Sequence, residues 1–183
     1  AGDATDPYEP GDPTGPRSVY GHTKLAGEQA VLADAERSWV VRTAWVYGET
    51  GGNFVKTIAR LEGERPTLSV VDDQRGSPTW SYDLAAGLLD LVRAIADGRP
   101  PADRVLHRTG GGETTWFGLA RAVFEELGAD PERVHPCTTE DFPRPAPRPA
   151  YSVLSDRTWL AAGLVPPLAW RTALTRFFGK YRG

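Results

Sequence analysis

The chain has 183 residues, of which 40% are hydrophobic and 25% charged, and its formal net charge at pH 7 is −3. So mild an acidic balance, without a block of lysine and arginine, argues against non-specific nucleic-acid binding. No apolar stretch is long enough to span a membrane. The single cysteine, Cys137, has no partner for an internal disulfide, so we expect a reducing cytoplasm, and the length suffices for one domain core.

Helical and strand-like segments alternate along the chain, as they do in α/β layered proteins. Residues 1–17 are rich in glycine and proline and are expected to form a polar surface loop. Apolar periodicity then predicts a helix over about 19–35, a short buried strand over 39–43, a helix over 54–61 and a strand over 68–71. No strand, glycine-rich turn and helix, the unit that holds the pyrophosphate in a dinucleotide-binding fold, precedes the first helix.

The alternation of helices and strands is predicted to continue in the second half of the chain. Thr114 or Thr115 is a suitable N-cap, and Gly128 a suitable C-terminal residue, for one of its helices. Prolines at alternate positions over 142–149 remove backbone donors and predict a rigid loop. The remaining elements are a helix over 82–96, a strand over 104–107, and helices over 115–127, 156–162 and 170–181.

Tyr20 and Lys24 are the first candidates for a functional role, because a helix brings residues i and i+4 onto one face. An ammonium beside a phenol favours the phenolate, so we expect a lowered pKa for Tyr20 and easier proton transfer near neutral pH. Such a tyrosine can act as general acid or base in a carbonyl/alcohol interconversion. The spacing alone is a weak signal, since an ordinary helix with an exposed Lys24 gives the same pattern.

Trp45 and Asn53 are further candidates. Trp45 follows the carboxyl end of the strand over 39–43, where open α/β sheets form binding crevices, although a tryptophan in an apolar run more often packs in a core. Asn53 can offer its amide to a sugar hydroxyl or a phosphate, or cap the helix that begins at Phe54, and the two roles are compatible. Gln74 and Arg75 either face a nucleotide or belong to a surface turn.

Two other signals are discounted. The glycines over 110–112 lie between a strand and a helix, but no Gly-Lys-Ser/Thr ending follows and Glu113 is negative, so a tight turn is favoured over a phosphate cradle. The histidines lack the spacing of a metal site, so no metal ligands are assigned. They are His22, His107 and His135.

Five blocks of the sequence, in this order and covering nearly the whole chain, resemble the dTDP-4-dehydrorhamnose reductases, a family of extended short-chain dehydrogenase/reductases. Among them is Tyr20-Gly-His-Thr-Lys24, which matches the Tyr-x-x-x-Lys helix that lies under the nicotinamide in that superfamily. The blocks span residues 19–28, 42–48, 52–54, 68–79 and 148–154.

The resemblance implies an α/β fold with a partial Rossmann-like, doubly wound sheet and a small carboxy-terminal substrate-binding portion. We expect a single domain or domain fragment over 1–183, in which 1–17 is a loop, 18–80 is the remnant of the Rossmann-like half, and 81–183 is mainly the substrate-binding portion. The chain is then the carboxy-terminal part of a reductase, separated from its nucleotide-binding half.

The resemblance also implies an activity. NADPH (or NADH) would deliver a hydride to C4 of dTDP-4-dehydro-rhamnose, with Tyr20 protonating the forming alkoxide and Lys24 also holding the nicotinamide ribose. Trp45 would form a wall of the dTDP-sugar site, and the product would be dTDP-rhamnose, a polysaccharide precursor. Magnesium is not carried over, because Tyr82 stands where the family places an acid. The third catalytic hydroxyl would lie upstream of Ala1. Because the part that anchors the pyrophosphate is missing, the chain alone is expected to turn over little or nothing.

Two alternatives stay open. A sugar-nucleotide epimerase or dehydratase of the same superfamily also carries Tyr-x-x-x-Lys. A reductase-like regulatory module would keep the fold without hydride transfer. The sequence leaves the oligomeric state undecided, with a homodimer among the options.

Overall fold

The computed structural model describes residues 2–142 and 148–181. Pairs of short strands join segments that lie far apart in the sequence. Three of the pairs are parallel, as in α/β proteins, and one is antiparallel. The pairs are β1 (Val40–Arg42) with β6 (Val105–His107), β2 (Val46–Tyr47) with β5 (Thr79–Trp80), β3 (Leu68–Val71) with β8 (Val134–Cys137), and, antiparallel, β4 (Arg75–Gly76) with β7 (Thr114–Thr115).

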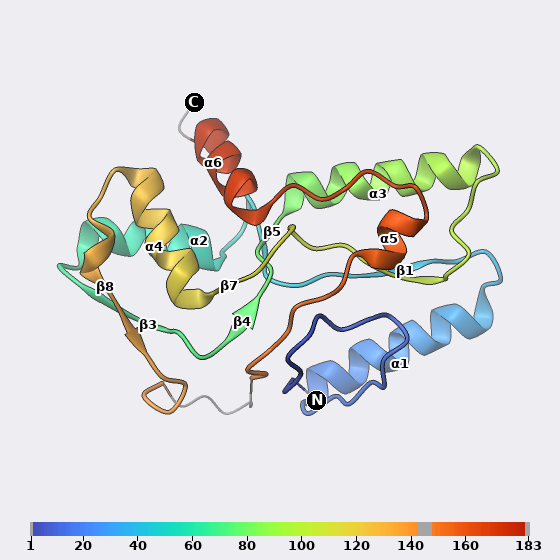
Figure 1. Cartoon of the computed structure of the whole chain (residues 1–183), viewed down its shortest axis with the longest axis horizontal. Coiled ribbons are helices and arrows are strands. Elements are labelled where there is room, and N and C mark those ends of the chain that lie inside the picture. Colours follow the sequence, from blue (N-terminus) through green and yellow to red (C-terminus); the bar gives the residue numbers. More distant parts are fainter. Residues whose placement is uncertain (1, 143–147, 182–183) are drawn as a thin grey trace.

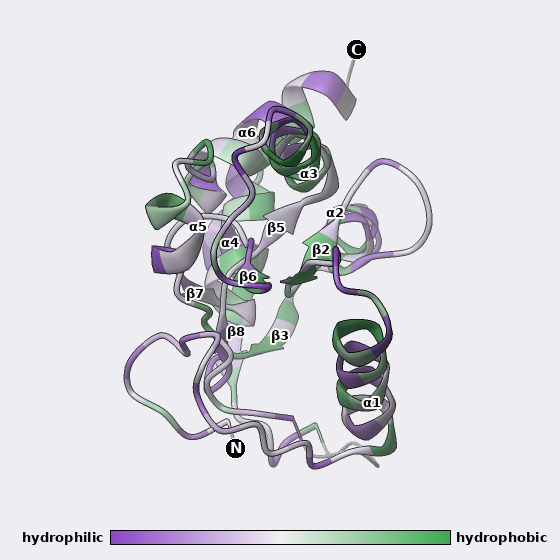
Figure 2. Ribbon diagram, turned by 90° about the vertical axis from the view of Figure 1, so that its right-hand side faces the viewer, coloured by the Kyte–Doolittle hydropathy of each residue, from purple (hydrophilic) through white to green (hydrophobic). Residues whose placement is uncertain are grey.

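Helices surround these strand pairs. Helices α1 and α3 lie on opposite sides of the β1–β6 pair, whereas α2, α4 and α6 gather at the other end of the molecule (Figures 1 and 2). The helices are α1 (Val19–Asp34), α2 (Phe54–Glu64), α3 (Ser81–Ala96), α4 (Trp116–Leu127), α5 (Arg157–Ala161), α6 (Trp170–Tyr181) and the short 3₁₀ helix η1 (Pro131–Arg133). Within the described residues, none of them is long and apolar enough to cross a membrane.

Side-chain caps explain where several helices begin. Ser18 accepts a hydrogen bond from the Gly21 amide at the start of α1, and Thr115, one of the two predicted caps, accepts from the Gly118 amide at the start of α4. Helix α4 ends at Gly128, whose φ of 75° is the left-handed conformation that glycine adopts without strain. The predicted helices are therefore confirmed, with shifts of up to three residues at their ends.

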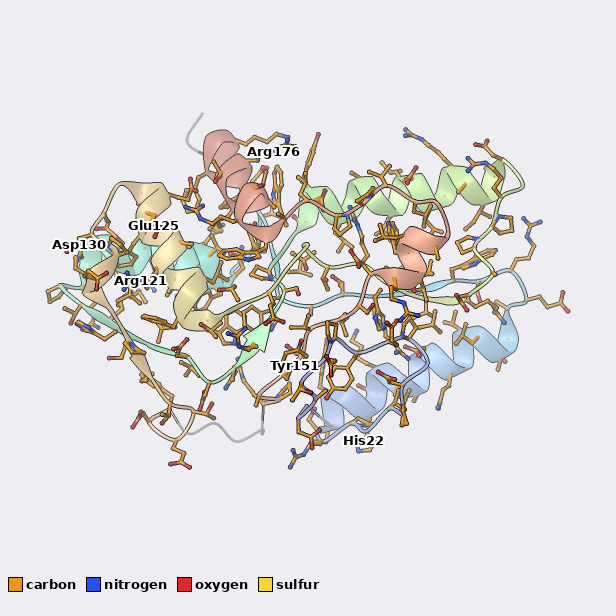
Figure 3. All side chains as sticks on the ribbon, in the orientation of Figure 1. His22, Arg121, Glu125, Asp130, Tyr151 and Arg176 are labelled. Carbon is orange, nitrogen blue, oxygen red and sulfur yellow. The ribbon has the colours of Figure 1, made fainter. Side chains whose placement is uncertain are left out.

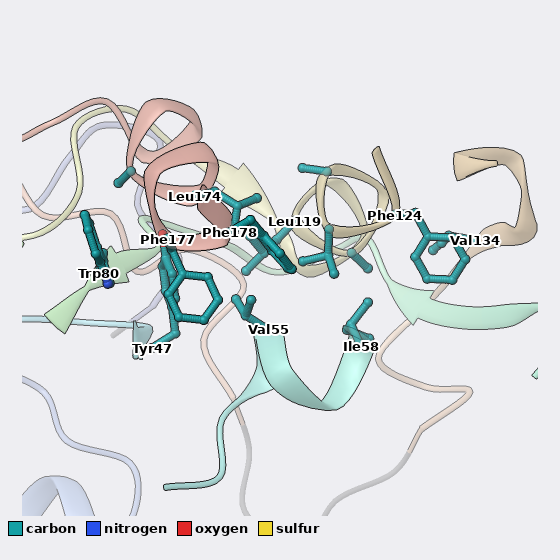
Figure 4. Close-up of a cluster of buried hydrophobic side chains, with 14 of the residues drawn as sticks. Tyr47, Val55, Ile58, Trp80, Leu119, Phe124, Val134, Leu174, Phe177 and Phe178 are labelled. Carbon is teal, nitrogen blue, oxygen red and sulfur yellow. The ribbon is translucent and has the colours of Figure 1, made fainter. Parts of the chain in front are cut away.

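Two hydrophobic cores hold the elements together. The larger lies between α2, α4, α6 and the β3–β8 pair, and includes Val55, Leu119, Phe124 and Phe177 (Figure 4). The smaller, with Leu91, Leu106 and Trp159 among its members, joins α3, β6 and α5. Helix α1 contributes no buried residue to either core.

Several strands were not predicted from the sequence. β2, β4, β5 and β7 have two residues each, too few to show an alternating pattern. Strand β8 contains Pro136, which argues against a strand in the sequence but is compatible with an edge position. The predicted proline-rich loop over 142–149 falls largely on residues 143–147, which lie outside the described residues.

The glycines over 110–112 form a tight connection, as the sequence favours. The Gly110 amide donates to Thr79 Oγ1 (3.1 Å) and the Gly111 amide to the Leu168 carbonyl (2.8 Å). A Cβ at Gly110 would lie 2.0 Å from the Pro78 carbonyl oxygen. These two amides serve the fold and are not available to a phosphate.

Candidate active site

Tyr20 and Lys24 lie on one face of α1, as their spacing predicts. The Lys24 Nζ atom is 5.5 Å from the centroid of the Tyr20 ring, within the range of a cation–π contact. Tyr20 is 71% exposed, so its hydroxyl is accessible to a bound molecule. The structure thus places an ammonium beside an accessible phenol.

Both residues line a cavity of about 1050 Å³ between α1, the whole length of β1 and the segment 148–154. Thr43 and Ala44 extend it along the chain that follows β1, and the loop before α1 closes one side. The part of the cavity beyond the carboxyl end of β1 lies where ligands usually bind in α/β folds.

His107 and Tyr151 also line this cavity, and sequence reasoning did not select them. Burial, reinforced by the nearby Arg42, lowers the pKa of His107, so its neutral imidazole is favoured. Burial and a hydrogen bond to Glu113 raise the pKa of Tyr151 to about 12, so it remains a neutral phenol that donates to Glu113 (3.0 Å). The only signal for His107 was its place at the end of a predicted strand.

Trp45 does not belong to the lining of the Tyr20 cavity. Its indole stacks on that of Trp116, and a Cβ on Gly76 would lie 2.4 Å from Trp45 Cε2. Trp45 also has a φ of 50°, rare for a bulky residue. The structure shows the packing role that the sequence left open, while the role in substrate binding stays a prediction.

Asn53 is the N-cap of α2. Its Oδ1 accepts from the Lys56 amide (3.0 Å) and its Nδ2 donates to the Gly48 carbonyl (2.8 Å). It borders a second cavity, of about 670 Å³, together with Lys56 and Arg60. The structure confirms the capping role, and contact with substrate stays a prediction.

Gln74 and Arg75 have partners within the fold. Gln74 is buried and donates to Thr139 Oγ1 (2.9 Å). Arg75 forms an ion pair with Glu113, which also accepts a hydrogen bond from Tyr151. Figure 3 shows Tyr151 between α1 and the rest of the molecule. In the part of the chain that the structure describes, no group of three or more His, Cys, Asp and Glu residues could hold a metal ion.

The fold is that of the Rossmann-like nucleotide-sugar enzymes. It superposes on the dTDP-4-dehydrorhamnose reductase of Clostridium acetobutylicum with a TM-score of 0.90 and 38% identity, covering 100% of this chain and 62% of that one. The Bacillus anthracis reductase, solved in complex with NADP, gives a TM-score of 0.90 and 35% identity over 98% of this chain and 61% of that one. The predicted α/β class with a partial Rossmann-like sheet is confirmed.

Residues 1–182 match the model of the RmlD substrate binding domain, and the chain belongs to that family. It is 55% identical over 169 residues to the dTDP-4-dehydrorhamnose reductase of Mycobacterium tuberculosis, covering 92% of this chain and 54% of the relative. It is 51% identical over 178 residues to a Streptomyces antibioticus protein described as a probable dTDP-4,6-dihydroxy-2-methyloxan-3-one 4-ketoreductase, covering 97% and 58%. The chain spans about half the length of these relatives.

Proposed function

We propose that the chain is the carboxy-terminal part of a dTDP-4-dehydrorhamnose reductase, which reduces the 4-keto group of dTDP-4-dehydro-rhamnose to give dTDP-rhamnose. The observation that carries the proposal is the Tyr20–Lys24 pair at an open cavity. The M. tuberculosis relative is named dTDP-4-dehydrorhamnose reductase.

In the proposed reaction, Tyr20 donates its hydroxyl proton to the oxygen of the substrate carbonyl as that oxygen becomes an alkoxide. The ammonium of Lys24 stabilises the phenolate that remains. Lys24 would also hold the nicotinamide ribose. Trp45 and Asn53 are proposed to contact the dTDP-sugar.

NADPH is the proposed cofactor, and it supplies the hydride. The cavity suits its nicotinamide end, because Tyr20 is exposed there and the cavity is comparable in volume to ordinary ligand pockets. The B. anthracis relative was solved with NADP, which favours NADPH over NADH. The glycines over 110–112 precede a helix, but the amides of Gly110 and Gly111 bond within the fold, so we propose that the amino-terminal half of a longer reductase holds the pyrophosphate.

We propose that residues 1–183 form one unit. The portion over 18–80 would contribute the catalytic helix to the nucleotide-binding half, and the portion over 81–183 would mainly bind substrate. The two portions interlock, because β1 pairs with β6 and β3 with β8. Cys137 is an unpaired thiol, which fits the cytoplasm, where we place the protein. A homodimer stays a prediction.

The test is a Tyr20→Phe substitution in the full-length protein. We expect NADPH oxidation driven by the keto-sugar to fall by roughly 10²- to 10⁴-fold, the usual contribution of a general acid. Tyr82→Phe is the matched control, since Tyr82 is also an exposed tyrosine near the start of a helix and should leave turnover unchanged. Unchanged turnover in Tyr20→Phe would remove this residue from the chemistry.

Product masses distinguish the alternatives. Reduction adds two hydrogens to the sugar, epimerisation leaves the mass unchanged and dehydration removes water. A full-length protein that binds the dTDP-sugar but turns over none of it would instead be the reductase-like binding module.

A further inference from the structure

Glu28 shares the face of α1 that carries the proposed catalytic pair, since it lies four residues after Lys24 and eight after Tyr20. On an exposed helix, lysine and glutamate at this spacing attract each other. Instead, both Glu28 oxygens bind one guanidinium, with Oε1 at 2.5 Å from Arg42 Nη2 and Oε2 at 2.9 Å from Arg42 Nε. Within residues 2–142 and 148–181, Lys24 forms no salt bridge.

Arg42 is well placed to hold the Glu28 carboxylate. It is the last residue of β1, and its backbone carbonyl accepts from the Arg108 amide (2.9 Å). Its Nη1 donates to the Pro10 carbonyl (3.3 Å). The side chains of Arg42 and Glu28 are only 24% and 15% exposed, so water screens this bidentate pair less than a surface pair.

Polar contacts help to hold α1 near β1, where Leu25 and Leu32 are only half-buried. The helix has no buried residue. Arg104 donates to the Leu32 carbonyl in the last turn of α1 (3.0 Å) and to the Ser38 carbonyl beyond the helix (3.1 Å). Because Arg42 is the partner of both Glu28 oxygens, its loss would leave this carboxylate able to turn toward Lys24.

We propose that Arg42 is a positioning residue of the active site, which engages Glu28 and so prevents this carboxylate from neutralising Lys24. The inference rests on the proposed function of Tyr20 and Lys24. An ammonium paired with Glu28 would be drawn from the phenol and would stabilise the phenolate less, because a carboxylate at ion-pair distance offsets most of its charge.

A double-mutant cycle in the full-length protein tests this, with kcat and KM measured for NADPH-dependent reduction of the keto-sugar. Arg42→Met should lower kcat by roughly tenfold or more, part of what acid–base catalysis contributes. Arg42→Met combined with Glu28→Gln should recover most of that loss, because no carboxylate remains to bind Lys24. A double variant no faster than Arg42→Met would overturn the proposal.

Variants that also carry Lys24→Met distinguish a positioning role of Arg42 from a structural one. If Arg42 acts through Lys24, adding Arg42→Met to Lys24→Met should lower kcat no further. A further loss of kcat in that background would show that Arg42 acts on the fold of the site. The control pair is Arg121 with Glu132. Figure 3 shows Arg121 on the far side of the molecule from α1, and Arg121→Met should leave kcat unchanged.

A second comparison leaves Arg42 intact, which matters if Arg42→Met fails to fold. Gly27 lies three residues after Lys24 on α1, and a Cβ there meets nothing within 4 Å. Gly27→Glu adds a carboxylate near Lys24 while Arg42 is occupied by Glu28, and Gly27→Gln adds the same bulk without charge. We expect kcat to fall several-fold further in the glutamate variant, and equal values in the two variants would contradict the proposal.

The Tyr20→Phe result keeps the two proposals apart. Turnover retained in Tyr20→Phe would refute the proposed function, whatever the Arg42 cycle shows. An inactive Tyr20→Phe variant together with an unrescued double variant would refute only the role of Arg42.

Discussion

The indole rings of Trp45 and Trp116 stack face to face, with their centroids 3.5 Å apart and their planes inclined by 9°. This stack accompanies a backbone φ of 50° at Trp45, a left-handed conformation that costs an L-residue about 1–2 kcal/mol. Gly76 provides room for the ring, because a side chain there would collide with it. A stacked aromatic pair contributes about 0.5–1.5 kcal/mol, an energy comparable to this backbone strain.

Two substitutions at Trp45 separate these contributions. Trp45→Ala removes the stack and keeps most of the strain, whereas Trp45→Gly removes both. We expect both variants to unfold at lower urea concentration than the parent, with the glycine variant more stable than the alanine variant by about 1 kcal/mol. An alanine variant at least as stable as the glycine variant would argue against strain at this position.

Asn53 can be tested for both of its roles. Asn53→Ala removes the cap of α2 and should lower the free energy of unfolding by about 1 kcal/mol, whereas Asn53→Ser keeps a capping oxygen and should cost little. The serine variant therefore tests the side-chain amide of Asn53 separately from its capping oxygen. A raised KM for the dTDP-sugar in Asn53→Ser, at near-parental stability, is the expected sign of substrate contact, and an unchanged KM would leave Asn53 as a cap alone.

His107 should make stability depend on pH. Burial lowers its pKa in the folded protein below the ordinary value of 6.5, so the unfolded chain binds the proton more readily. The contribution of His107 to the free energy of unfolding is therefore complete above about pH 7. It decreases as the pH falls from the pKa of the unfolded state toward the lower pKa of the folded state. Urea unfolding between about pH 7.5 and pH 5 should show a steeper loss for the parent than for His107→Gln, and parallel curves would contradict this.

Asp83 and Arg108 form a buried ion pair, 3.1 Å apart, beneath α3. The Arg108 side chain is 2% exposed and passes Gly87, where a Cβ would lie 2.5 Å from its Nε. Asp83→Ala would leave this guanidinium buried and unpaired, and should cost about 3–5 kcal/mol in thermal or chemical unfolding. The exposed pair of Asp97 with Arg99 is the control, and its loss should cost less than about 1 kcal/mol.

The long helices could be predicted because their signals are local. Thr115 and Gly128 mark the two ends of α4 in the sequence, and the spacing of Tyr20 and Lys24 fixes their common face once α1 is helical. These features need no knowledge of the rest of the fold.

The missed features depend on contacts between distant segments. Strand β2 exists only because residues 46 and 47 meet residues 79 and 80, and no pattern within two residues indicates this. His107 reaches the cavity because β6 pairs in register with β1, which places it opposite Arg42. The stacking of Trp45 on Trp116 likewise joins residues 71 positions apart, counting from 45 to 116.

Pro136 in β8 has a consequence for the behaviour of the protein in concentrated solution. The Asp72 amide donates to the Cys137 carbonyl, so the backbone polar groups of Cys137 point toward β3. Because these groups alternate in direction along a strand, the backbone of Pro136 points toward the outer edge. A proline there offers no N–H to an incoming strand. The rim of this small sheet is thereby protected against strand addition from a neighbouring molecule, and self-association into β-rich aggregates is discouraged at this edge.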